Sequence, residues 1–267
     1  MCELFAMSAN VPTDACFSFK GLMQRGGKTG PHKDGWGIGF YAGRRAQMFH
    51  DQRPCYDSSI AQLIANQPIK SEVVIGHIRQ ANSGAINLQN THPFLRELWG
   101  RDWVCAHNGQ LKNQPVCDQG YYQRVGSTDS EKAFVSILNH IRNEFPKKPK
   151  YMPPVWRRIH QLCMALNQFG VFNLVISNST ELMAFCSTKL FYLTRRAPFG
   201  VAELIDDDVT INFQAHTTEQ DIVTVVATQP LTNNEHWVEM QAGQMIVLKK
   251  GQVVKQFYAE HDPVIEL

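Results

Sequence analysis

Short runs of apolar and β-branched residues recur along the whole chain and constrain its fold more than any other feature. Nine of these runs predict strands, at 36–41, 73–78, 103–107, 171–177, 182–186, 191–194, 223–227, 245–248 and 253–258. Polar residues and glycine break the pattern at 178–180 and 250–251, which predicts a hairpin turn at each place. So many strands exclude an all-helical protein.

Two further segments have the spacing of amphipathic helices. In 129–145, apolar residues recur at three- and four-residue intervals, and Thr128 with Glu131 predicts a capping box at its start. A second long helix is predicted at about 154–169, and shorter ones at 15–23 and 58–66. Helices among hairpin-connected strands favour an α+β layered sandwich with mostly antiparallel sheets.

Composition restricts the class of protein. The 267 residues are 43% hydrophobic, enough for a substantial core, and we expect residues 1–267 to form a single domain. The net charge of +2 is far from the basic footprint of a protein that binds nucleic acid or a membrane surface. Residues 1–15 do not resemble a signal peptide, and no stretch approaches the roughly 20 apolar residues of a membrane span. We therefore expect a cytoplasmic protein that acts on a small molecule or another protein.

The cysteines argue against a disulfide framework and a cysteine zinc site, because they form an odd set without a CxxC pair. Three histidines, His77, His92 and His107, could in principle meet at a metal, but their spacing does not require it. We expect no metal. Most cysteines should be reduced, buried and apolar in behaviour, and they stand at positions 2, 16, 55, 105, 117, 163 and 186.

Cys2 is a candidate nucleophile. A small second residue permits removal of Met1, which would leave a thiol and a free α-amine on the same residue. An unperturbed thiol has a pKa of about 8.5, and an α-amine with a pKa near 7.7 to 8.0 can accept its proton directly or through water. Taken alone, however, a cysteine at this position is weak evidence.

Polar groups follow two of the predicted strands, where binding groups are commonly displayed. Arg79 could hold a carboxylate through two parallel hydrogen bonds, although a lone arginine is more often a surface ion-pair partner. Asn108 and the N–H of Gly109 could donate to a tetrahedral oxyanion, although Asn-Gly is also a common hairpin turn. Neither site is specific by itself.

Two more residues have both a structural and a functional interpretation. Asp129 begins the best-defined helix and could hold a substrate ammonium group, or it could simply complement the helix dipole. His92, in the segment 90–94, is better interpreted as a structural loop histidine than as a proton-transfer group.

Six fragments occur together in the order and spacing of one family: MCELFAM, HKDGWGIGFY, HIRQANSG, NTHPF, AHNG and STDSE. With them the chain resembles the class II glutamine amidotransferases of the N-terminal nucleophile hydrolase superfamily. Its second half resembles the stand-alone, YafJ-like branch of that family, through GVFNLVIS, FCSTKLFYLTRRAPFG and VVATQPLT. The likeness extends over nearly the whole chain.

The resemblance implies a four-layer αββα sandwich with two antiparallel sheets. It also implies that Cys2 is the nucleophile and its α-amine the base. Asn108 and Gly109 would form the oxyanion hole, and Arg79 and Asp129 would hold the carboxylate and ammonium of a glutamine. No cofactor is required for this chemistry.

The chain departs from the synthase-linked members, which have tryptophan and threonine where Gln80 and Asn82 stand. Without the aromatic lid, a wider pocket is expected, which could admit a γ-glutamyl compound larger than glutamine. Asn82 and His92 complete the expected substrate-binding set.

The predicted activity is cleavage of the γ-amide of glutamine or a γ-glutamyl compound through a Cys2 thioester. One alternative is a γ-glutamyl peptide hydrolase acting on a larger, thiol-containing substrate, and another is an inactive regulatory or scaffolding module. A separate ammonia-accepting synthase is a possible partner.

Overall fold

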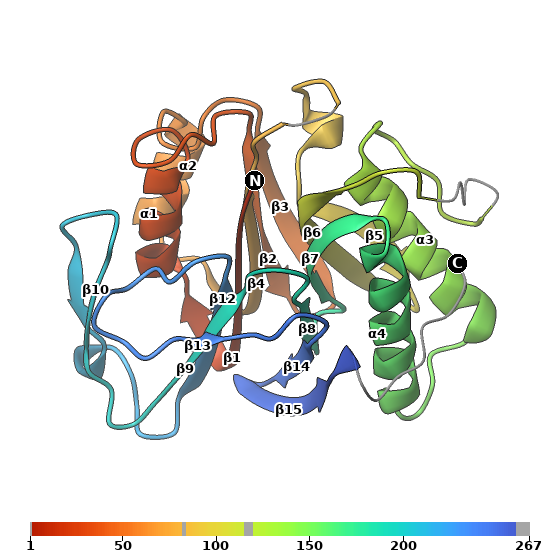
Figure 1. Ribbon diagram of the computed structural model, residues 1–267. Coiled ribbons are helices and arrows are strands. Elements are labelled where there is room, and N and C mark those ends of the chain that lie inside the picture. The colour runs from red at the N-terminus through yellow and green to blue at the C-terminus, as the bar shows by residue number, and fades with distance from the viewer. Residues whose placement is uncertain (1, 82–83, 115–119, 260–267) are drawn as a thin grey trace.

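A computed structural model describes residues 2–81, 84–114 and 120–259, which contain two large sheets between two pairs of helices (Figure 1). The strands of both sheets pair antiparallel. The first sheet consists, in spatial order, of β13 (Val238–Glu239), β9 (Phe191–Arg196), β12 (Ile222–Ala227), β1 (Glu3–Asp14), β4 (Lys70–Ile78), β2 (Trp36–Ala42) and β3 (Arg45–Asp51). The second consists of β15 (Gln252–Phe257), β14 (Met245–Lys249), β8 (Leu182–Phe185), β7 (Gly170–Ser177), β6 (Arg101–Leu111) and β5 (Phe94–Leu98).

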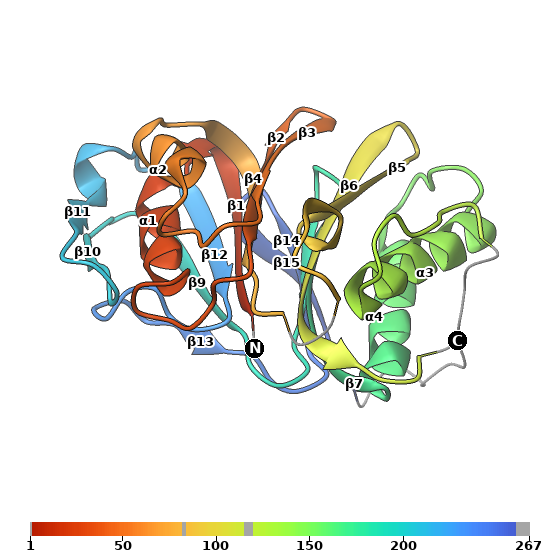
Figure 2. The same ribbon diagram turned by 90° about the horizontal axis from the view of Figure 1, so that it is seen from above.

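The helices form the two outer layers (Figure 2). The first sheet is covered by α1 (Cys16–Arg25) and α2 (Ser59–Asn66), and the second by α3 (Asp129–Glu144) and α4 (Pro153–Asn167). Apolar side chains fill the space under each helix pair and the space between the sheets. Each fully buried large side chain contributes about 1.5 to 3 kcal/mol, so these three cores hold the four layers together. The predicted αββα sandwich is therefore confirmed.

Smaller elements lie outside these layers. A two-stranded ribbon is formed by β10 (Val201–Glu203) and β11 (Thr210–Asn212), and single 3-10 turns occur at Leu88–Asn90 and Phe213–Ala215. Among the described residues, no helix has both the length and the apolar character needed to cross a membrane. The described cysteines are free, and four of them are fully buried, namely Cys55, Cys105, Cys163 and Cys186.

The predicted start of α3 is partly correct. The Thr128 hydroxyl accepts the N–H of Glu131 at 3.2 Å, which is the capping contact expected from the sequence. The Glu131 carboxylate, however, accepts the N–H groups of Val125 and Gly126 and the guanidinium of Arg96. It therefore orders the segment before the helix rather than completing a capping box.

The central strand of the first sheet, β1, is absent from the sequence-based prediction. It is buried on both faces over residues 3–9, so it lacks the alternation of a half-exposed strand, and Asn10 and Pro12 interrupt its later part. The prediction also missed the edge strands β3, β5 and β13 and the ribbon of β10 and β11. The nine predicted strands and four predicted helices all occur, with small differences at their ends.

The two sheets are held together by polar contacts in addition to the apolar core between them. The Tyr41 hydroxyl, on the first sheet, donates toward the carbonyls of Asp102 and Ser177 at the second. In the β14–β15 turn, Gly251 accepts the Thr224 hydroxyl at 2.7 Å and donates its N–H to Ser8 at 3.1 Å. The predicted turn at 250–251 therefore packs directly on the other sheet.

Gly251→Ala should destabilise the protein by about 2 to 3 kcal/mol, because an added methyl meets a backbone position with φ of +71° and little space. Its Cβ would lie 2.0 Å from the Ile222 carbonyl oxygen. The matched control is Gly200→Ala, whose Cβ meets nothing within 4 Å and should change stability by less than about 0.5 kcal/mol. Urea unfolding measures both, and equal stabilities would contradict the contact between this turn and the first sheet.

Candidate active site

One pocket collects most of the residues that the sequence predicted for the site. Cys2, Arg79, His92, Gly109 and Asp129 all line it. They are, in order, the residue before β1, the residue after β4, a residue of the segment before β5, a residue inside β6 and the first residue of α3. The free volume is only about 30 Å³, so the lining side chains nearly fill the pocket. The wider pocket expected beside Gln80 stays a prediction.

Strand register places Cys2 beside the end of β4. Glu3 pairs with Ile78, so Cys2 lies next to the residues that follow β4. The Gln80 N–H donates to the Cys2 Sγ at 3.3 Å, and this sulfur lies 3.4 Å from the Gln80 carbonyl oxygen. Burial raises the pKa of the Cys2 thiol, although the Gln80 hydrogen bond and the charge of Arg79 oppose that shift. The thiol therefore needs a base to become a nucleophile at neutral pH.

The side chain of Asn108 is buried, but it makes no hydrogen bond that stabilises the fold. Its side chain is 0% exposed, and neither its Nδ2 nor its Oδ1 has a hydrogen-bond partner in the described part of the chain. An unpaired buried amide costs about 1 to 3 kcal/mol, so its presence calls for an explanation. Asn108 is not among the residues that line the pocket, but it precedes Gly109, which is.

Gly109 lies inside β6, opposite Phe172 of β7, so the hairpin turn considered for Asn108-Gly109 is wrong. Its φ is +157°, and a Cβ there would lie 1.8 Å from the Val171 carbonyl oxygen. Only glycine allows β6 and β7 to approach this closely. The dipeptide thus belongs to a paired strand whose backbone borders the pocket.

Arg79 is buried, with 4% of its surface exposed, which excludes the alternative of a surface ion pair. Its guanidinium donates to the carbonyls of Ala85 at 3.0 Å and Gly84 at 3.3 Å. Burial lowers the pKa of Arg79, while the nearby Cys2 and Asp34 act in the opposite direction. The backbone of Arg79 is also held, since its N–H donates to Gly35 and its carbonyl accepts the N–H of Asp34.

Asp129 connects α3 to the end of β6. One carboxylate oxygen accepts the Leu111 N–H at 2.7 Å, which fixes the first turn of the helix against the strand. The residue is partly exposed and lines the pocket, where its negative charge acts on His107. Asn82, the remaining predicted binding residue, lies outside the described residues.

Three buried histidines form one wall of the pocket. The Nδ1 of His92 lies 3.1 Å from the Nε2 of His77, and His107 contacts the Ser130 hydroxyl at 2.8 Å. Burial holds the pKa of His77 and of His92 well below its usual value, so both rings are neutral at pH 7. Within the described part of the chain, no group of three potential ligands is arranged to hold a metal ion.

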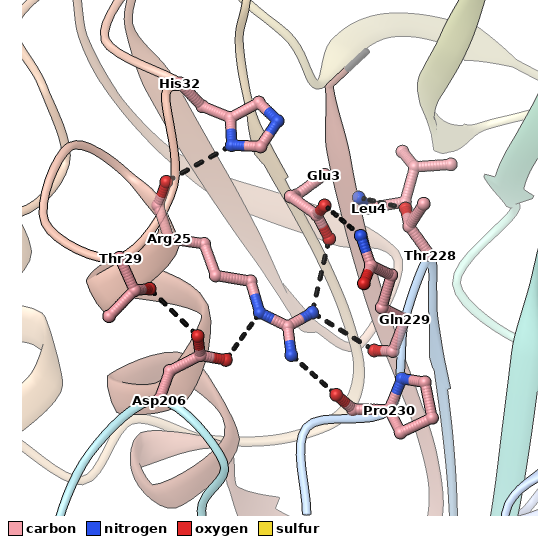
Figure 3. Close-up of polar contacts among 9 residues, drawn as sticks. All are labelled: Glu3, Leu4, Arg25, Thr29, His32, Asp206, Thr228, Gln229 and Pro230. Carbon is pink, nitrogen blue, oxygen red and sulfur yellow. Dashed lines mark hydrogen bonds and ion pairs between the residues drawn. The ribbon is translucent and has the colours of Figure 1, made fainter.

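A second polar network, centred on Arg25, has no signal in the sequence (Figure 3). Arg25, at the end of α1, forms ion pairs with Glu3 at 3.3 Å and Asp206 at 2.7 Å, and donates to the carbonyls of Gln229 and Pro230. Glu3 follows Cys2 directly, so this network anchors the start of β1. Asp206 lies 181 residues from Arg25, a separation that no local pattern reveals.

The chain is similar in sequence to known proteins over nearly its whole length. The profile of the class II glutamine amidotransferases matches residues 1–264. YafJ of Escherichia coli, named as a candidate glutamine amidotransferase, is 54% identical over 254 residues, covering 95% of this chain and 100% of YafJ. A similarly named Haemophilus influenzae protein is 44% identical over 256 residues, covering 96% of this chain and 87% of the relative.

Solved structures show the same relationship. A predicted glutamine amidotransferase from Pseudomonas aeruginosa is 48% identical, with a TM-score of 0.77 over 95% of this chain and 100% of that chain. The glutamine phosphoribosylpyrophosphate amidotransferase from B. subtilis is 17% identical, with a TM-score of 0.64 over 96% of this chain and 49% of that chain, a likeness of fold alone. This chain therefore belongs to the class II glutamine amidotransferases and has the N-terminal nucleophile hydrolase fold.

Proposed function

We propose that the protein cleaves the γ-amide of glutamine or of a γ-glutamyl compound, with Cys2 as the nucleophile once Met1 has been removed. The observation that carries this proposal is the convergence of Cys2, Gly109, Arg79 and Asp129 on one pocket. Each of these residues has a weak signal alone, and the pocket unites a thiol, a backbone donor, a guanidinium and a carboxylate. Membership of the family supports the same reaction.

The reaction begins with transfer of the thiol proton from Cys2 to its own α-amine. The sulfur then attacks the γ-carbonyl carbon, and the resulting oxyanion accepts hydrogen bonds from the Asn108 amide and the Gly109 N–H. The C–N bond breaks as the α-ammonium returns its proton to the leaving nitrogen. Water, deprotonated by the same α-amine, finally cleaves the γ-glutamyl thioester.

Arg79 and Asp129 orient the substrate by its two charged ends. The guanidinium binds the α-carboxylate and the aspartate binds the α-ammonium, which fixes the γ-carbonyl over the sulfur. Asn82 and His92 are proposed to complete the contacts with the bound substrate.

The alternatives concern the substrate and its fate. A larger γ-glutamyl peptide with a thiol would use the same thioester chemistry, and an ammonia-accepting synthase would consume the product of glutamine cleavage. An inactive regulatory module would retain the fold but release no amine from any of these amides.

Cys2→Ala should abolish release of ammonia from glutamine and of amine from γ-glutamyl amides, because no other group replaces the thiolate. Intact mass should show that Met1 is missing from the active protein. Cys16→Ala is the matched control, since Cys16 is also partly exposed but lies outside the pocket, and it should retain activity. Unchanged turnover in Cys2→Ala would remove the nucleophile assignment.

Asn108→Ala should lower kcat by about 10²-fold to 10³-fold, as expected for loss of one oxyanion donor, with no hydrogen bond lost from the fold. Asn173, its register partner on β7, is the matched control. Asn173 bonds the Asn108 carbonyl, the Thr188 hydroxyl and three N–H groups, so Asn173→Ala should mainly lower stability. Steady-state kinetics and thermal unfolding separate the two effects, and full activity in Asn108→Ala would contradict its role.

Arg79→Gln should shift alkylation of Cys2 by iodoacetamide to higher pH. The positive charge of Arg79 lowers the pKa of the Cys2 thiol, so its removal raises that pKa and reduces the thiolate fraction at a given pH. Iodoacetamide is small and neutral, and therefore does not need the substrate clamp. Arg53→Gln, a largely exposed arginine, is the control and should leave the alkylation profile unchanged. Coincident profiles for all three proteins would reject the proximity of Arg79 and Cys2 charges.

A further inference from the structure

Asn90 is a buried polar residue to which the proposed reaction assigns no role. It ends the 3-10 turn at Leu88–Asn90, is 1% exposed, and is not among the residues that line the Cys2 pocket. The Asn87 side chain begins this turn by accepting the Asn90 N–H at 2.9 Å. A buried amide needs partners for its donors and its acceptor within the protein, so the partners of Asn90 show what it holds in place.

The nitrogen of the Asn90 amide bonds the loop that orients Arg79. The Asn90 Nδ2 donates to the Ala85 carbonyl at 3.0 Å, and the same carbonyl accepts the Arg79 guanidinium, also at 3.0 Å. A backbone carbonyl has two lone pairs and can accept both bonds. The Gly84 carbonyl accepts the guanidinium as well, at 3.3 Å. The position of the guanidinium therefore depends on where Asn90 holds residues 84–85.

The same amide bonds the segment that leads into α3. The Asn90 Oδ1 accepts the Ser127 N–H at 2.8 Å, and the Nδ2 also donates to the Ser127 hydroxyl at 3.2 Å. Ser127 precedes Thr128, whose hydroxyl caps α3, and Asp129 is the first residue of that helix. Asn90 therefore also fixes the start of the helix that presents Asp129 to the pocket.

Two glycines leave the space that the Asn90 amide occupies. A Cβ added to Gly84 would lie 3.3 Å from the Asn90 Nδ2 and 3.5 Å from the Ser127 Oγ. A Cβ added to Gly126 would lie 2.3 Å from the Asn90 Oδ1. The loop that holds Arg79 and the segment before α3 thus approach each other closely, with the Asn90 amide between them.

We propose that Asn90 is a positioning residue that sets the separation between Arg79 and Asp129. This inference rests on the proposed function, in which these two residues hold the α-carboxylate and the α-ammonium of the substrate. Both substrate groups are attached to one carbon atom, so their partners must stand at one fixed separation to bind them together. Asn90 connects the two partners from outside the pocket, through the Ala85 carbonyl and the Ser127 backbone.

Calorimetric titration with L-glutamate and with glutarate tests this role, because the two ligands differ only in the α-ammonium group. A fixed separation matters for L-glutamate, which binds by both groups, and not for glutarate, which offers nothing to Asp129. Asn90→Ala should weaken L-glutamate binding by about tenfold, as expected when one charge-assisted hydrogen bond is weakened, and glutarate binding by no more than about twofold. Equal weakening of both ligands, or of neither, overturns the proposal, as does equal binding of the two ligands by the wild-type protein.

Asn139→Ala is the matched control for the loss of a buried amide. The Asn139 side chain is also buried, and it bonds the N–H and the carbonyl of Tyr122, away from the loop that holds Arg79. This variant should lower stability but leave the ratio of the two affinities unchanged. Ser127→Ala is a milder second variant, which removes only the hydroxyl contact with Asn90 and should lower the ratio about twofold. Thermal unfolding shows whether Asn90→Ala is folded, and if it is not, an unchanged ratio in Ser127→Ala overturns the proposal.

Hydrolysis of glutamine separates failure of this inference from failure of the proposed function. In the active protein, Asn90→Ala should lower kcat/KM by about tenfold, in line with the loss of binding. Cys2-dependent release of ammonia, together with an unchanged ratio of affinities in Asn90→Ala, overturns the positioning role and leaves the proposed function intact. A selective loss of L-glutamate binding, with no turnover of any γ-amide by the wild-type protein, overturns the proposed function and supports the positioning role.

Discussion

The pairing of β1 between β4 and β12 is the constraint on which the site depends. This pairing determines which residues lie beside Cys2, because Glu3 is opposite Ile78 and Leu4 exchanges hydrogen bonds with Thr228. The Arg25 network fixes the same strand from its other face. A one-residue slip would turn Cys2 away from the pocket and Glu3 into it, and the buried faces of β1 make such a slip costly. The position of the thiol is therefore set by long-range pairing rather than by its own sequence neighbourhood.

Much of the fold follows from local patterns, and the exceptions have physical causes. Apolar periodicity was sufficient for α3 and α4, and β-branched runs were sufficient for strands such as β7 and β12. The prediction missed β1 because a strand buried on both faces has no alternating pattern of apolar and polar residues. The Asn108-Gly109 pair was ambiguous because the same dipeptide suits a turn, and only the close approach of Val171 shows why glycine is needed within a strand.

The residue types of the candidate site were predictable from the sequence, but the surroundings of its pocket were not. The motifs indicated the residues that meet around Cys2, since strand ends and a helix start commonly display polar groups. They did not indicate the Arg25 network on the other face of β1, because Asp206 and Gln229 reach it from the second half of the chain. The described residues that line the Cys2 pocket all come from the first half.

The unpaired amide of Asn108 also has a thermodynamic consequence. A buried group without a partner, at about 1 to 3 kcal/mol, consumes a sizeable part of the roughly 5 to 15 kcal/mol by which a protein is usually stable. Any bound molecule that offers an oxygen to that amide recovers part of this deficit and shifts the unfolding equilibrium toward the native state. A ligand that bonds this amide should therefore raise the melting temperature of the protein.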